Sequence, residues 1–349
     1  MFIFSKACLG FLTIIATATS LLVNLPGIAS ESLEQQLDIQ PNNYTQGQSR
    51  DIADQLLRLG QQEIEENHYE AAIAAWYRAI SIYIALGDFP SAGLAYDYIG
   101  NTYAELGRYP EAEDVFRRRL AIAQDETDFQ GQIYGLNNLG NVLIQRGYWP
   151  QAQSAFQSAL VIAQDIEDFA GIGLSFSNLG LVAKLQGNLI DAQTYYEVAT
   201  EYRFRAEDWI GQAHSSNNLG QLYRQRGLSR EALGAFLVAR QAASEAGHIP
   251  TLLPALDGLI HVYSDRGDLA QVRQYLNERI AITGGSTSNP VQTLGTLIQL
   301  GDYYQQLGNP MAAQEAYQQA LVLARQLGDI PREAFVLNQL QVVQFQEQE

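Results

Sequence analysis

The chain has 349 residues, of which 47% are hydrophobic, and it carries a formal net charge of −17. With 38 acidic and 21 basic residues, it lacks the clustered lysine and arginine that wrapping nucleic acid or binding an anionic membrane surface requires. The single cysteine, Cys8, lies near the N-terminus, which excludes disulfides, thiolate metal sites and cysteine nucleophiles from the rest of the chain.

Residues 1–30 are typical of an export signal. Lys6 provides a short basic region, residues 9–25 are largely apolar, and small residues surround an expected cleavage point after Ala29 or Ser30. An uncleaved N-terminal anchor is the alternative, because the apolar stretch is close to the minimum length of a membrane span. In both cases we expect the bulk of the chain to lie outside the cytoplasm, in a periplasmic, lumenal or secreted location.

Residues 31–50 are polar and have no apolar period, which predicts a flexible linker. From residue 51 onward, glycine returns every 40 residues in two phases that are seven residues apart. The first phase includes Gly100, Gly140, Gly180 and Gly220, and the second includes Gly107, Gly147, Gly187 and Gly227. A fixed period of this size predicts stacked repeats that form one continuous array.

Each unit contains two stretches of apolar residues at helical spacing. In the third unit, Leu139 and Leu143 share one face of the first helix, and Ala152 and Phe156 share one face of the second. A glycine in the middle of a helix costs about 1 kcal/mol relative to alanine, so Gly140 and its equivalents indicate the close approach of a neighbouring helix.

The ends of the helices also have a signature. Gly147 is expected to end the first helix in the left-handed conformation, and Pro110 and Pro150 suit the first turn of a second helix. Between units, the pattern Asp128-Phe129-Gln130-Gly131 recurs at residues 168–171 and 208–211. We interpret its aspartate as a helix start and its aromatic residue as a plug in the groove between successive units.

The repeat has a recognisable consensus. In the second unit it reads Ile99-Gly100, Tyr103, Gly107, Ala112 and Phe116, and in the fifth Leu219-Gly220, Tyr223, Gly227, Ala232 and Phe236. This pattern resembles the tetratricopeptide repeat family, in the 40-residue variety of kinesin light chains and Leu-Gly-Asn repeat proteins. The resemblance implies an all-α, right-handed solenoid of antiparallel helix pairs.

Under this interpretation, residues 51–282 form units one to six and residues 283–290 form a loop. Residues 291–343 form the seventh unit and a capping helix, and residues 344–349 form a polar tail. The sixth unit is irregular, because Ile260 replaces the packing glycine and Leu276 replaces the aromatic residue. The sequence leaves open whether this unit and the following loop act as a hinge.

In the family that the chain resembles, the first helix of each unit lines a concave groove. The candidate peptide-binding residues at groove positions are the amides Asn101, Asn138, Asn141, Asn178, Asn218 and Gln221 and the cations Lys184 and Arg224. The amides either form hydrogen bonds between adjacent helices or offer a ladder to the backbone of an extended peptide, since an amide both donates and accepts. The two cations either pair with an acidic side chain or C-terminal carboxylate of a partner, or are ordinary solvated charges.

Signals of catalysis are weak. None of the four histidines, His68, His214, His248 and His261, has metal-ligand spacing with a second histidine or a cysteine, and the glycines form no phosphate-binding loop. We therefore expect no enzyme activity, cofactor or metal site, no nucleic-acid partner, and membrane contact only through an uncleaved leader. The predicted function is a non-catalytic scaffold for a protein or extended peptide. The alternative is a self-association module or an assembly factor of a larger envelope complex.

Overall fold

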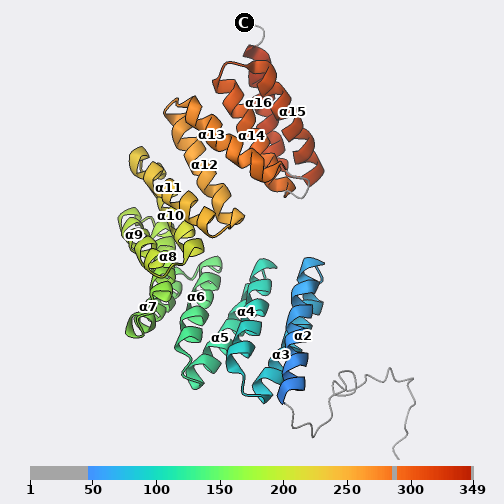
Figure 1. Ribbon diagram of the computed structural model, residues 1–349, viewed down its shortest axis with the longest axis vertical. Coiled ribbons are helices and arrows are strands. Elements are labelled where there is room, and N and C mark those ends of the chain that lie inside the picture. The colour runs from blue at the N-terminus through green and yellow to red at the C-terminus, as the bar shows by residue number, and fades with distance from the viewer. Residues whose placement is uncertain (1–45, 285–288, 347–349) are drawn as a thin grey trace, which may run out of the picture.

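A computed structural model describes residues 46–284 and 289–346, so the expected export signal lies outside the described residues. The described part consists of fifteen helices and contains no strand, and consecutive helices pack as antiparallel pairs (Figure 1). The predicted all-α solenoid is confirmed. The helices are α2 (Gln46–Glu65), α3 (Tyr69–Ala85), α4 (Phe89–Glu105), α5 (Tyr109–Asp125), α6 (Phe129–Gln145), α7 (Trp149–Asp165), α8 (Phe169–Leu185), α9 (Leu189–Arg205), α10 (Trp209–Gln225), α11 (Ser229–Glu245), α12 (Ile249–Asp265), α13 (Leu269–Thr283), α14 (Pro290–Gln306), α15 (Pro310–Leu327) and α16 (Ile330–Gln346).

The even-numbered helices are the first helices of the units, here called helices A, and the odd-numbered ones are helices B. From α4 to α12 the helices are 17 residues long and separated by three-residue connections, which explains the 40-residue period. Gly107 and Gly147 follow helices A with φ of 71° and 79°, which confirms the predicted left-handed ends. Glycine is common at such positions because it has no Cβ to clash with the carbonyl.

The glycines of the first phase lie against an aromatic ring of helix B in the same unit. A Cβ added at Gly140 would come closer than 3.0 Å to Phe156, and one added at Gly180 would lie 2.8 Å from Tyr196. Both rings are fully buried. The predicted close helix approach is therefore confirmed, and it applies equally to Gly100 against Phe116 and to Gly220 against Phe236.

The sixth unit fills the same space differently. Ile260 and Leu276 are both buried in the core, where the other units place a glycine and an aromatic ring. A larger residue on helix A is thus matched by a smaller one on helix B, which keeps the interior close-packed.

The array is curved (Figure 1). Helices A contact the next helix A from α4 through α12, whereas helices B pack mainly against helices A, so helices A form the inner side of the curve. Among consecutive described helices, α13 and α14 pack least closely, on either side of residues 285–288. None of the described helices is both long enough and apolar enough to cross a membrane.

Three expectations need correction: the end of the linker, the start of the tail and the aromatic plug at Phe129. Helix α2 begins at Gln46, so the last residues of the expected linker are helical, and α16 continues through Gln346, into the expected tail. The expected helix start is confirmed for Asp128 and Asp208, whose carboxylates accept hydrogen bonds from backbone N–H groups at 2.8 and 2.9 Å, whereas Asp168 precedes α8 without such a bond. The aromatic plug is wrong for Phe129, whose side chain is 45% exposed.

Candidate functional site

Six of the eight candidate binding residues line two hollows on the helix A side. Lys184, Gln221 and Arg224 line a hollow of about 520 Å³ between α8, α10 and α12, which we call the cationic hollow. Asn101 and Asn141 line a hollow of about 350 Å³ between α4 and α6, which we call the amide hollow. Asn138 also lines the amide hollow, whereas Asn178 and Asn218 line neither hollow.

The cationic hollow carries unpaired positive charge. Neither Lys184 nor Arg224 lies within 4.0 Å of a carboxylate in the described part of the chain. Asp257 lines the same hollow, but its carboxylate already pairs with Arg279 at 2.8 Å. The hollow therefore has an excess of positive charge in a protein whose net charge is −17.

His261 also lines the cationic hollow. Although its ring keeps contact with solvent, the surrounding protein desolvates it, and this effect lowers the pKa of the imidazole below its ordinary value. The neighbouring Arg224 lowers the pKa further, because it disfavours a second positive charge.

The repeated asparagines divide into two groups. Asn138 donates to the Asp97 carboxylate at 3.1 Å, and Asn178 donates to the Asn137 side chain at 2.8 Å, each across to the preceding helix A. For these two residues, the structure supports the hydrogen-bond interpretation that the sequence left open. Asn101, Asn141 and Gln221 are exposed and make no side-chain hydrogen bond to another described residue, so they are the amides that a ligand can reach.

The structure also contains a buried charge network that the sequence interpretation missed. Arg119 of α5 and Arg279 of α13 are 6% and 2% exposed, and they pair with Asp97 and Asp257 of helices A at 3.6 and 2.8 Å. Gln299 donates to Asp257 at 2.8 Å in the same way that Asn138 donates to Asp97. Each network joins neighbouring units. The sequence signal for these networks was the presence of arginine at a helix B position where other units have Ala159, Ala199 and Ala239.

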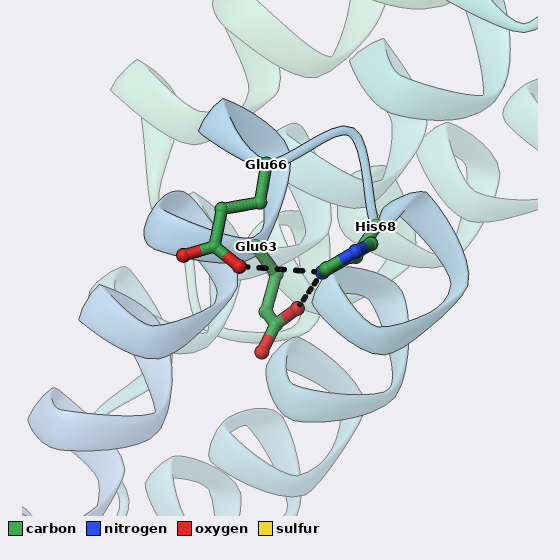
Figure 2. A group of neighbouring side chains, drawn as sticks. All are labelled: Glu63, Glu66 and His68. Atoms are coloured by element: carbon green, nitrogen blue, oxygen red, sulfur yellow. Dashed lines mark hydrogen bonds and ion pairs between the residues drawn. The ribbon is translucent and has the colours of Figure 1, made fainter.

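One cluster has donors that could hold a divalent cation. Figure 2 shows Glu63 and Glu66 of the first unit directed toward His68, whose Nδ1 lies 2.9 and 3.5 Å from the two carboxylates. The sequence does not indicate this group, because the group contains one histidine, no second histidine and no cysteine. All three side chains contact solvent, and an imidazole between two carboxylates also forms an ordinary ion pair, so the geometry alone does not make a metal centre.

Comparison with known proteins agrees with this architecture. Models of the tetratricopeptide repeat family match residues 95–128, 136–168, 171–245 and 294–327. No curated protein matches the sequence.

Solved structures share the fold at low identity. A signal transduction ATPase with a tetratricopeptide repeat sensor from Pyrococcus horikoshii is 17% identical with a TM-score of 0.62, over 85% of this chain and 45% of that one. Yeast Tom70 is 15% identical with a TM-score of 0.61, over 90% and 58% of the two chains. BtubC from P. vanneervenii is 18% identical with a TM-score of 0.57, over 63% and 92%.

A Rap protein complexed with competence and sporulation factor is 15% identical with a TM-score of 0.53, over 89% of this chain and 79% of that one. This chain spans less than half the length of the ATPase and little more than half that of Tom70. At these identities the similarity establishes the fold. Together, the family matches, the helix pairs and the glycine–aromatic contacts show that the chain is a solenoid of tetratricopeptide repeats.

Proposed function

We propose that the protein is a non-catalytic scaffold that binds an extended segment of a partner protein along its helix A side. The cationic hollow would receive an acidic side chain or a C-terminal carboxylate, and Asn101, Asn141 and Gln221 would bond to the backbone of the segment. These amides can donate to a carbonyl and accept from an N–H, which are the two groups that an extended backbone presents.

The observation that carries this proposal is the lack of carboxylate partners for Lys184 and Arg224. Eleven other arginines of the described chain pair with a carboxylate, whereas these two cations face a hollow in which the one carboxylate is already engaged. Bringing an acidic group to such a site gains charge complementarity, which favours both the encounter and the orientation of a partner.

Support also comes from the fold. A Rap protein of this fold has been crystallised in complex with competence and sporulation factor. We further propose that the protein acts outside the cytoplasm. This part of the proposal rests on the export signal expected at residues 1–30.

The test is selection from a random dodecapeptide library displayed on phage, with the purified protein as bait. The combined variant Asn101→Ala, Asn141→Ala and Gln221→Ala should lose most of the enrichment obtained with the wild type. The matched control replaces Gln151, Gln157 and Gln164, three exposed amides of helix B α7, with alanine. Equal enrichment by all three proteins would contradict binding in the groove.

A second candidate function is self-association or an assembly role through the helix B side. A separate hollow of about 410 Å³, lined by Phe204, Trp209 and Val238, favours it, because Phe204 and Val238 are 54% and 40% exposed. Light scattering of the purified protein distinguishes the two functions. A concentration-dependent dimer that Phe204→Ser abolishes would support the second.

A further inference from the structure

A third hollow extends the helix A surface beyond the cationic hollow. Its volume is about 370 Å³, it lies between α12, α14 and α16, and it shares His261 with the cationic hollow. We call it the acidic hollow, because Asp265 and Asp302 line it and its only basic side chain is His261.

Asp302 lacks a compensating cation. Its side chain is half-buried, and no lysine or arginine of the described chain lies within 4.0 Å of it. One oxygen accepts a hydrogen bond from the Tyr317 hydroxyl at 2.6 Å. Burial raises the pKa of this carboxyl, which the hydrogen bond from Tyr317 and the nearby His261 only partly oppose.

The rest of the acidic hollow suits a long basic side chain. Phe335, which is 42% exposed, provides apolar surface, the buried Ile260, Val272 and Tyr303 lie at its wall, and the amides of Gln305 and Gln339 also line it. Lysine and arginine bury their methylene stems along apolar surface while the charged end contacts polar groups. The acidic hollow thus offers such a side chain both apolar surface and negative charge.

The two hollows therefore carry opposite, uncompensated charges on adjoining parts of one surface. Arg224 lines the cationic hollow from α10 and Asp302 lines the acidic hollow from α14, so a segment that enters both hollows crosses α12, whose His261 lines both. A helix with its side chains is about 10–12 Å across and an extended peptide rises about 3.3 Å per residue, so the segment needs at least about three residues to cross α12.

We propose that the partner segment is bipolar, with an acidic side chain in the cationic hollow and a basic side chain in the acidic hollow, at least about three residues apart. This inference rests on the proposed function, and it adds the charge pattern and spacing of the segment. A bipolar segment satisfies both hollows at once, whereas a purely acidic one places like charge beside Asp302.

The experiment is selection of phage-displayed random dodecapeptides by the purified protein and its charge variants. Wild type should enrich peptides with an acidic and a basic residue at a separation of at least about three positions. Arg224→Glu should remove the acidic preference and keep the basic one, and Asp302→Asn should do the reverse. For a bipolar peptide selected by the wild type, each variant should bind about tenfold more weakly.

The matched control is Arg230→Glu, which makes the same charge change at an exposed residue of helix B α11. It should leave the selected pattern unchanged, and circular dichroism should show that all variants fold. If wild type enriches peptides without the charge pair, or if Asp302→Asn selects the same basic residues, the bipolar inference is overturned while peptide binding stands. If wild type enriches no peptide, the proposed function itself fails, and the inference fails with it.

Discussion

Replacing Gly140 with alanine tests the contact between a glycine and an aromatic ring, a contact that repeats through the solenoid. Alanine gains about 1 kcal/mol of helix propensity over glycine, which by itself predicts a more stable protein. In the folded chain, however, the new Cβ would come closer than 3.0 Å to the Phe156 ring, which is fully buried. Overpacking of a core costs about 1–3 kcal/mol. Because neither the ring nor the backbone can move away freely, we expect about 2–3 kcal/mol, which leaves a net loss of about 1–2 kcal/mol after the gain in helix propensity.

The structure suggests a compensating change. Unit six places Leu276 where unit three has Phe156, and a larger residue occupies its glycine position. Phe156→Leu alone should cost about 1–2 kcal/mol, since it removes part of a buried ring. In the double variant the alanine methyl enters the space that the ring leaves. The double variant should therefore lose about 1–2 kcal/mol less stability than the sum of the two single losses.

The measurement is urea unfolding followed by circular dichroism, with hydrogen exchange of α6 and α7 to report the local stability, because long arrays can depart from two-state unfolding. The control is Gly234→Ala in α11, where an added Cβ meets no atom within 4 Å. It should stabilise the protein by up to about 1 kcal/mol. If Gly140→Ala stabilised the protein as the control does, or if the two changes were additive, the packing argument would be refuted.

Three further predictions follow from other parts of the structure. Thr127, at φ 57°, occupies a left-handed position where other units have Gly87 and Gly247. Thr127→Gly should therefore raise the stability in thermal unfolding by about 1 kcal/mol, whereas the control Glu126→Gly, at φ −91°, should not. The buried Tyr196 hydroxyl has no partner among the described residues, so Tyr196→Phe should be neutral or stabilising. Tyr317→Phe should cost about 1 kcal/mol, because it loses the hydrogen bond to Asp302. A larger loss of stability for Tyr196→Phe than for Tyr317→Phe would contradict this reasoning. Burial opposes the charged form of Glu113, but hydrogen bonds from Arg117 and Arg146 outweigh this effect and lower the pKa of the carboxyl. The ionised group therefore stabilises the fold above its ordinary pKa of 4.5, and this contribution is lost as the pH falls below that value. Melting temperatures of Glu113→Gln should therefore fall less steeply with acid than those of the wild type, and parallel curves would exclude this role.

The sequence by itself determined the architecture. The 40-residue period, the two glycine phases and the capping aspartates are local signals, because each specifies the backbone within one unit and every unit repeats it. Gly140 illustrates this: its position inside a helix required a close neighbour, whichever residue that neighbour proved to be.

The tertiary structure alone decided which polar residues remain available for a partner. Asn138 and Asn141 are both candidate groove amides in the sequence, yet Asn138 donates to Asp97 in the preceding unit, whereas Asn141 remains exposed in the amide hollow. The same holds for Asp257 and Asp302, of which the first is paired with Arg279 and the second has no such cation. The physical reason is that these partners come from different helices, so the superhelical stacking, and not the local period, determines which charges are satisfied and which face a hollow.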